Sequence, residues 1–163
     1  MADEAVERVA DALGREETVR GLLDTAAREL VATLDASACL ISRVVGDLLV
    51  SLVEFSRDDR QLGLGHEYLI PDYPLTREVV EQGQPRAVSL LEEKPEPNEA
   101  KLLEELGFES LLMTCLPSNG QCWGLVEVYL DDRLFGEEAA VLAREIAIIA
   151  GCQLERLEAR PKT

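Results

Sequence analysis

The chain has 163 residues, and 47% of them are hydrophobic, so it fits one domain with a core of ordinary size. Its formal net charge of −16 would repel a phosphate backbone or an anionic membrane surface, so neither nucleic acid nor membrane is an expected partner. No run approaches the ~20 consecutive apolar residues of a membrane span, and the acidic, amphipathic N-terminus is unlike a signal peptide. We therefore expect a cytoplasmic protein.

The first half of the chain is predicted to begin with two helices and to continue with short strands. Apolar residues at helical spacing from Val6 to Leu13, followed by Gly14, predict the first helix. Gly46-Asp47 between two β-prone runs predicts a hairpin, and Pro74 can occupy the first turn of a short helix. The expected elements after the first helix are a helix at 19–34, strands at 38–45, 48–55 and 67–70, and a helix at 75–82.

The second half of the chain contains the strongest local signal, Asn119-Gly120 between two apolar, β-prone runs. Both residues tolerate the positive φ angles of a type I′ turn, so this pattern predicts a hairpin. Glu137 and Glu138 suit the start of a helix because carboxylates interact favourably with its N-terminal dipole. The expected elements are a strand at 87–90, a helix at 99–106, the hairpin at 110–130 and a long helix at 137–158.

This order of elements predicts an α+β fold with one antiparallel sheet. Long terminal helices are expected on one face of the sheet, with the short helices and loops over the other face. The second face is not sealed by long elements, so we expect a pocket there. The predicted organisation is an N-terminal helix at 1–16, a domain at 17–159 and a tail at 160–163.

The predicted turn also assigns the hairpin residues to faces, if pairing continues unbroken from Ser118 and Gln121. One face would carry Leu112, Thr114, Leu116, Trp123, Leu125, Glu127 and Tyr129. The other face would carry Leu111, Met113, Cys115, Val126 and Val128. The second set is uniformly apolar and is expected to pack on the long helices. The first set mixes a few polar groups with apolar ones, which is typical of a small-ligand site.

The candidate ligand-binding residues are those of the mixed face together with a tyrosine-containing segment before the first short inner helix. They are Tyr68, Tyr73, Thr76, Leu112, Thr114, Leu125, Glu127 and Tyr129. Glu127 should have a perturbed pKa or a charged partner, which could be an amine or guanidinium of a ligand, or Arg77 or Arg86. The alternative is that these polar groups bind loop backbone over a filled core.

The four cysteines, Cys39, Cys115, Cys122 and Cys152, are expected to be free thiols because the composition is that of a cytoplasmic protein. Cys115 and Cys122 would be diagonal neighbours roughly 7–8 Å apart, which is long for a disulfide. With no basic residue nearby in sequence, a redox role is the weaker interpretation. Four cysteines and one histidine at these spacings also do not indicate a metal site.

Signatures of enzymes are missing from the sequence. It contains no G-x-S-x-G motif, no P-loop and no H-E-x-x-H motif. His66 is the only histidine, so a serine or cysteine nucleophile activated by histidine is nearly excluded. We therefore predict a binding and signalling module and no catalytic residues.

Three motifs resemble those of the GAF domain family, in the order in which that family carries them. They are Ser110-Leu111-Leu112 with Leu116-Pro117, Gly124-Leu125-Val126-Glu127-Val128, and Phe135-Gly136-Glu137-Glu138, with a similar middle segment at Pro71–Val88. Two departures from the family motifs stand out. Leu116-Pro117 has the reverse order of the Pro-Leu that the family carries, and Gly136 stands where the family commonly has threonine. The resemblance covers Glu17 to Leu157 and implies a GAF-like fold of the profilin-like or PAS-like type.

Membership would imply a regulatory module, since relatives bind cyclic nucleotides, bilins, haem or amino acids, or bind nothing. The Cys-His pair to which bilins attach is absent, and Tyr129 stands where bilin-binding relatives carry a pocket histidine. The cyclic-nucleotide motif and the cysteine context of free methionine sulfoxide reductases are also absent. Haem would depend on His66 alone. The cofactor or ligand is therefore left unknown.

Two functions remain open at this point. The first is a bacterial sensor domain that binds a small molecule and dimerises through its terminal helices to control an output domain or partner protein, either as a stand-alone module or as part of a longer signalling protein. The second is a ligand-free dimerisation module, in which Tyr129 and Trp123 would fill the pocket. Redox sensing and haem binding are weaker alternatives. The residues predicted for the dimer interface are Val6, Leu13, Ala143, Ala147, Ala150 and Leu154.

Overall fold

The structure is a computed structural model that describes residues 2–63 and 67–159. Its helices are α1 (Ala2–Gly14), α2 (Val19–Leu34), α3 (Pro74–Gln82), α4 (Pro97–Leu106) and α5 (Glu137–Glu158), with a 3-10 turn at Ile70–Asp72. Its strands are β1 (Ala38–Val45), β2 (Leu48–Ser56), β3 (Glu67–Leu69), β4 (Arg86–Ser89), β5 (Ser110–Ser118) and β6 (Gln121–Leu130). Each predicted element is present. The tail at 160–163 and His66, the residue considered for haem, lie outside the described residues.

Local capping explains where α2 and α4 begin, at Val19 as predicted and at Pro97, two residues before the predicted start. The Thr18 side chain accepts a hydrogen bond of 3.0 Å from the backbone N–H of Gly21 at the start of α2. The Glu96 carboxylate accepts one of 2.7 Å from the N–H of Glu99, directly before Pro97 in the first turn of α4. These side chains satisfy N–H groups that have no partner within their own helix.

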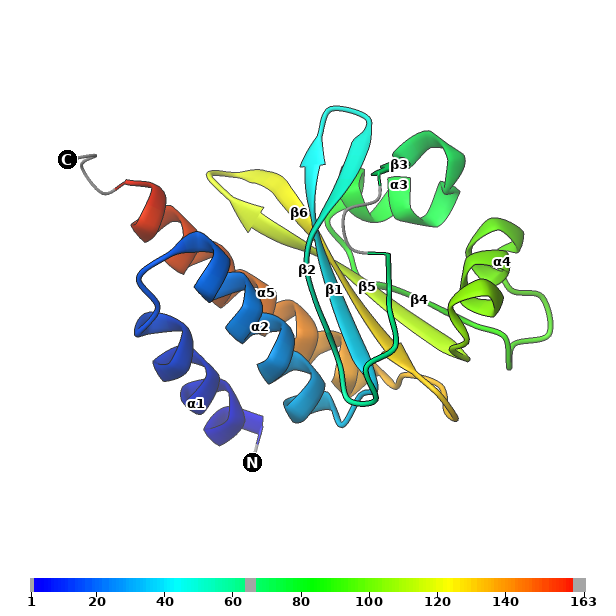
Figure 1. The fold of residues 1–163 in the computed structure, drawn as a ribbon, viewed down its shortest axis with the longest axis horizontal. Helices are drawn as coiled ribbons and strands as arrows, with labels where there is room; N and C mark the ends of the chain where they lie inside the picture. The colour runs from blue at the N-terminus through cyan, green and yellow to red at the C-terminus, as the bar shows by residue number, and fades with distance from the viewer. Residues whose placement is uncertain (1, 64–66, 160–163) are drawn as a thin grey trace.

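The six strands form one antiparallel sheet in the order β3-β2-β1-β6-β5-β4. Helices α1, α2 and α5 lie on one side of this sheet, and α3 and α4 lie on the other (Figure 1). The predicted α+β class and the predicted distribution of long and short helices are therefore confirmed.

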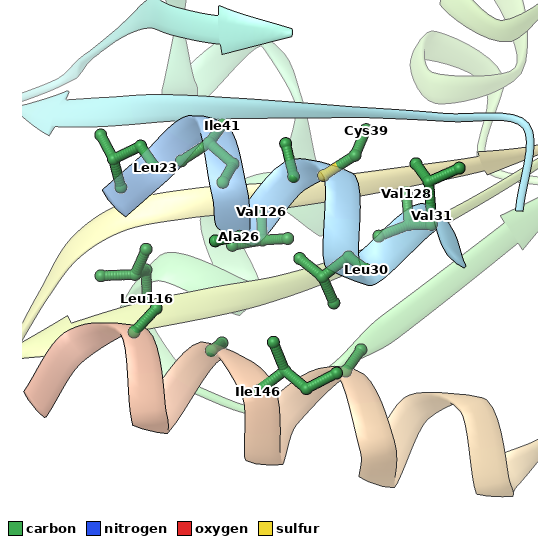
Figure 2. Close-up of a cluster of buried hydrophobic side chains, with 14 of the residues drawn as sticks. Leu23, Ala26, Leu30, Val31, Cys39, Ile41, Leu116, Val126, Val128 and Ile146 are labelled. Carbon is green, nitrogen blue, oxygen red and sulfur yellow. The ribbon is translucent and has the colours of Figure 1, made fainter. Parts of the chain in front are cut away.

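The larger core lies between the sheet and the long helices (Figure 2). Leu23 and Leu30 of α2 pack there with Ile41 and Val126 of the central strands and with Ile146 of α5. Alternate residues of the strands and one stripe of each helix supply these side chains, because both periodicities place every core residue on the same side. A second, smaller core lies on the other side of the sheet.

The structure corrects the residues predicted for a dimer interface. Within one chain it buries Leu13 and also Ala143, Ala147, Ala150 and Leu154, while Val6 is half-buried. These buried residues cannot present a surface to a second copy. The prediction was wrong because it gave α5 one neighbour, the sheet, whereas α5 packs against β5, α2 and α1 together. The predicted interface residues of α5 therefore pack inside the chain.

The β5–β6 turn is confirmed, but the register predicted from it is wrong along most of the hairpin. Asn119 and Gly120 both have positive φ, at 52° and 76°. The register then shifts between Leu116 and Pro117, because Trp123 is an extra residue in β6 that forms a bulge. A one-residue shift exchanges the two faces of β5.

Because of this shift, two of the predicted site residues, Leu112 and Thr114, lie on the side of the sheet opposite the pocket. Leu112 and Leu116 pack in the core beneath the long helices, and Thr114 is paired with Val126 of that core. Leu112 and Thr114 are therefore not part of the pocket face. Leu111 and Met113 occupy that face instead. In β6 the assignments hold for Leu125 and Tyr129, which belong to the smaller core, but not for Trp123, which packs against the larger core.

The prediction of four free thiols is wrong. Cys115 and Cys122 form a disulfide with their Cα atoms 5.6 Å apart. That separation is usual for a disulfide and is shorter than the roughly 7–8 Å expected for diagonal neighbours, although Cys122 is paired with Pro117 as in the unbroken register. Cys39 and Cys152 are free, the first buried and the second exposed.

None of the helices in residues 2–63 and 67–159 combines the length and the apolarity needed to cross a membrane.

Candidate functional site

A small cavity lies in the core between the sheet and helices α3 and α4. Its volume is about 10 Å³, which is room for about one water molecule. The apolar part of its wall consists of Leu40, Leu49, Leu62, Leu102 and Leu106. The polar part consists of Tyr68, Tyr73, Thr76, Glu99, Glu127 and Tyr129. Both the sheet and the short helices therefore contribute to the site.

Five of the residues predicted for a ligand site line this cavity, namely Tyr68, Tyr73, Thr76, Glu127 and Tyr129. Leu125 belongs to the same core without lining the cavity, and Leu112 and Thr114 lie across the sheet. Sequence reasoning missed Glu99. The signal for it was its position on α4, where it shares a helix face with Leu102, Leu103 and Leu106 at spacings of three, four and seven residues.

Glu127 is the central acid of the cavity. Its side chain is only 6% exposed, and one carboxylate oxygen accepts a hydrogen bond of 3.0 Å from the Tyr129 hydroxyl. Burial, reinforced by the charge of Glu99, raises the pKa of Glu127 to about 8. The arginines considered as its partners bind elsewhere, Arg77 to Glu81 and Arg86 to Glu78.

Glu99 approaches the cavity from the opposite wall. It is 1% exposed and accepts a hydrogen bond of 2.5 Å from the hydroxyl of Thr76 on α3. Burial is the main cause that raises its pKa, and the hydrogen bond from Thr76 acts against this rise. No lysine or arginine pairs with Glu99 or Glu127 anywhere in residues 2–63 and 67–159. Two acids without a cationic partner thus share one small cavity.

All three tyrosines of the chain line the cavity. Tyr68 and Tyr73 are half-buried and meet edge to face, with ring centroids 6.1 Å apart. Tyr129 is fully buried and packs against Phe108 at 4.9 Å. Burial is the leading cause that raises the pKa of each of the three, so all of them keep their hydroxyl protons at neutral pH.

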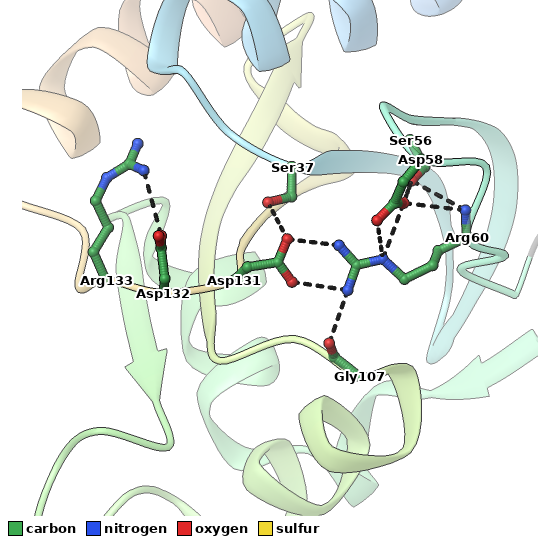
Figure 3. A network of polar contacts seen from close by, with 8 residues as sticks. All are labelled: Ser37, Ser56, Asp58, Arg60, Gly107, Asp131, Asp132 and Arg133. Atoms are coloured by element: carbon green, nitrogen blue, oxygen red, sulfur yellow. Dashed lines mark hydrogen bonds and ion pairs between the residues drawn. The ribbon is translucent and has the colours of Figure 1, made fainter.

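A loop after β2 closes one side of the cavity and is held by Arg60 (Figure 3). The Arg60 guanidinium donates two hydrogen bonds to Asp131, of 2.8 and 2.6 Å, and one of 2.8 Å to the carbonyl of Gly107. It also stacks over the ring of Phe108 at 3.9 Å. Asp131 lies directly after β6, in the connection to α5, so the loop is attached to that connection.

The same loop places Leu62 in the cavity wall, where it is completely buried. The N–H of Leu62 donates a hydrogen bond of 2.6 Å to the carboxylate of Glu54 on β2. Arg60 and Leu62 therefore hold the loop from both sides. We name residues 57–63 the cover loop.

The arrangement can bind a molecule through buried acceptors and phenolic hydroxyls. Among the described residues, the cavity wall contains no cysteine, serine or histidine that could act as a nucleophile or its base. The described chain also contains no group of three or more histidine, cysteine, aspartate or glutamate side chains that could hold a metal ion.

Solved structures with a similar fold include light-sensing proteins. One is the chromophore-binding domain of a Stigmatella aurantiaca bacteriophytochrome, a point mutant in the Pr state, at TM-score 0.82 and 15% identity. The match covers 98% of this chain and 60% of that one, so the chain spans 60% of that domain's length. Another is a far-red-absorbing dark state with bound biliverdin IXa, at TM-score 0.80 and 18% identity, covering 94% of this chain and 99% of that one.

No curated protein matches this chain by sequence. The family model of the GAF domain matches residues 18–154, which is most of the chain. The match includes the hairpin, the cavity and nearly all of α5. The chain therefore belongs to the GAF domain family.

Proposed function

We propose that this chain is a non-catalytic sensor domain that binds a small molecule in the cavity over its sheet and regulates a signalling output. The observation that carries the proposal is the pair of buried acids, Glu99 and Glu127, which share one cavity without a cationic partner in the described chain. Burying an ionisable group without a partner costs several kcal/mol. A cavity that served only to fill the core would be expected to use apolar residues.

The cover loop supports a route from the cavity to α5. Leu62 lines the cavity, and Arg60 of the same loop binds Asp131 in the connection that leads to α5. A molecule that displaces Leu62 would pull on that connection, because the two are joined by a bidentate pair. We propose that α5 passes the binding state to an output domain or a partner protein.

A tetrapyrrole does not suit this cavity, although similar folds hold chromophores. The cavity has room for about one water, and its acids would repel the propionate groups of a bilin or haem. Of the free cysteines, Cys39 is in the core on the opposite side of the sheet and Cys152 is exposed on α5. Neither is placed to hold a chromophore in the cavity.

The small volume of the cavity favours a second candidate, a ligand-free module that serves only in dimerisation. Tyr129 fills much of the space over the sheet, as that alternative requires. Trp123 does not, because it packs toward the core of the long helices. The two candidates differ in whether a molecule ever enters between α4 and the sheet.

For either candidate we propose a homodimer formed by the outer faces of α1 and α5. Val141 and Ile148 of α5 are 57% and 43% exposed, and Val6 of α1 is half-buried. Large apolar side chains gathered on a helix surface are typical of association sites. This surface replaces the buried stripe that the sequence had indicated.

Native mass spectrometry of the purified chain, followed by a thermal-shift screen of small cations, anions and neutral molecules, separates the candidates. We expect a bound mass or at least one compound that raises Tm, by roughly 2–4 °C per kcal/mol of binding. The Glu127→Gln variant should lose that shift, whereas Glu104→Gln, an exposed glutamate of α4, should keep it. A native mass equal to that of the protein alone, together with no rise in Tm for any class of compound, would favour the ligand-free module.

A further inference from the structure

We infer that the ligand of this cavity is a small organic cation, whose ammonium group lies between Glu99 and Glu127 and is surrounded by tyrosine rings. The inference rests on the proposed function and names the chemical class of the ligand. Three features of the cavity carry it: the sign of its charge, its aromatic wall and the position of its half-buried residues.

The charge of the cavity selects a cation. Glu99 on α4 and Glu127 on β6 belong to opposite walls, and each accepts a side-chain hydrogen bond from one neutral hydroxyl, that of Thr76 or Tyr129. A carboxylate has about four acceptor positions, so both retain capacity toward the cavity. An ammonium group donates up to three hydrogen bonds and can satisfy both acids at once. An anion would instead meet two like charges.

The aromatic wall favours an organic cation. Tyr68 and Tyr73 come from the segment that precedes α3, Tyr129 comes from β6, and all three line the cavity. Tyrosine faces attract ammonium groups and interact favourably with their alkyl substituents. A bare metal ion needs more ligands: Ca²⁺ takes about six to eight oxygens, and the described residues contain no cluster of three acidic or other metal-binding side chains.

The exposure of the lining residues indicates how the ligand is oriented in the cavity. Glu99, Glu127, Thr76 and Tyr129 are buried, whereas Tyr68, Tyr73, Leu102 and Leu106 are half-buried. The water-sized space of about 10 Å³ suits an ammonium head group between the acids. The alkyl part then extends between the half-buried residues toward solvent, and they must move apart to admit it.

Binding should depend on pH, because the ammonium group requires ionised acids. Glu127 faces Glu99 from α4, Tyr68 from β3 and Tyr129 from its own strand, while the Cys39 thiol of β1 lies on the other side of the sheet. Its pKa of about 8 means that it is mostly protonated at pH 7. Binding of a cation must then release a proton, and affinity should rise about tenfold per pH unit up to about pH 8.

Isothermal titration calorimetry of the full chain tests the class of ligand with three probes of similar size. These are n-butylammonium chloride, neutral 1-butanol and sodium butyrate, each titrated near pH 7 and pH 8 in two buffers of different ionisation enthalpy. We expect butylammonium alone to bind, with proton release at the lower pH. Glu127→Gln and Glu99→Gln should weaken binding at least about tenfold. Glu104→Gln, exposed on α4, should leave it unchanged.

The outcomes separate this inference from the proposed function. Binding of 1-butanol or butyrate as tight as that of butylammonium overturns the cationic class while leaving a ligand-binding domain. Failure of butylammonium to bind overturns the inference, and the broader thermal-shift screen then decides whether the cavity binds anything. Circular dichroism establishes that each variant is folded. If one of the variants is not folded, the comparison of the three probes on the unmodified chain still tests whether the ligand is a cation.

Discussion

At the scale of single residues, the unusual feature of this protein is an acid buried in the middle of its sheet. Glu127 occupies a strand whose neighbouring positions are apolar, and it is held by Tyr129 two residues away on the same face. Alternation along β6 placed both side chains correctly. The second acid, Glu99, joins them only through the packing of α4 on the sheet.

The raised pKa of Glu127 predicts that alkaline pH destabilises the protein. The folded chain holds this proton up to about pH 8, whereas the unfolded chain releases it near the ordinary value of 4.5. The unfolded state therefore binds fewer protons in this window, so the free energy of unfolding falls as pH rises through it. We expect a loss of order 1–4 kcal/mol between about pH 5 and about pH 8.

Urea unfolding at both pH values measures this loss. Glu127→Gln should show a smaller decrease than the unmodified chain, because it lacks the titrating group. Glu104→Gln, an exposed glutamate, should behave like the unmodified chain. If the unfolding free energy of Glu127→Gln depended on pH as strongly as that of the unmodified chain, Glu127 would not be the group that causes the loss.

At the scale of elements, the close approach of α5 to the end of β5 joins the hairpin to the closing helix. A Cβ atom at Gly151 would lie 1.8 Å from the carbonyl oxygen of Pro117, so only glycine fits there. Near this contact, the N–H of Asn119 donates a hydrogen bond of 2.6 Å to the carboxylate of Glu155. The hairpin turn and α5 are therefore held together by close packing and by a hydrogen bond.

We predict that Gly151→Ala destabilises the protein although alanine favours helices. The added methyl group must push α5 away from a backbone atom, which costs about 1–3 kcal/mol or more. The gain in helix propensity is only about 1 kcal/mol. Thermal unfolding compares this variant with Gly14→Ala, whose methyl group would meet only the Gln153 side chain at 3.8 Å. A Gly151→Ala protein as stable as Gly14→Ala would refute the close contact.

The cover loop is the second element whose role depends on one residue. We predict that Arg60→Ala loosens residues 57–63, because it removes the hydrogen bonds to Asp131 and to the Gly107 carbonyl. Solvent screens this partly exposed network, so the loss in unfolding free energy should be about 1–2 kcal/mol. Hydrogen exchange of the loop should accelerate.

The control for the cover loop is Arg77→Ala, which removes an exposed pair with Glu81 within α3. Such a pair contributes about 0.3–0.5 kcal/mol. Exchange in residues 57–63 should be unaffected by it. If both variants accelerate exchange equally, Arg60 is not what holds the loop.

At the scale of the whole molecule, the sheet separates two different environments. The side facing α2 and α5 is an apolar core, and the side facing α3 and α4 contains the polar cavity (Figure 1). The closing helix contacts the first side and is linked to the second through Asp131. Its outer surface carries the exposed apolar residues Val141 and Ile148.

We predict that two neighbouring substitutions on α5 act differently. Ala147→Glu places a charge in the core, where Ala147 is 1% exposed, and should destabilise the folded chain by several kcal/mol. Ile148→Glu lies on the outer face and should change stability by less than about 0.5 kcal/mol while weakening the proposed dimer. Urea unfolding and sedimentation velocity measure the two effects. An unmodified chain that sediments as a monomer would contradict the dimer.

Much of this architecture could be read from local signals in the sequence. Helical periodicity and caps such as Thr18 determine where the helices lie, and Asn119-Gly120 determines the hairpin turn, because these preferences act within a few residues. Alternation along β6 placed Leu125, Glu127 and Tyr129 on the pocket face for the same reason.

Only the tertiary structure decided the remaining features, since each depends on contacts between distant segments. The bulge at Trp123 has no local signature, yet it exchanges the faces of β5 relative to β6. The burial of Ala147 depends on helices α1 and α2 covering α5 from the other side. The pairing of Glu99 with Glu127 around one cavity likewise requires α4 to fold over the sheet. The pattern of apolar residues in the sequence predicts which face of an element is apolar, but the arrangement of several elements determines what that face contacts.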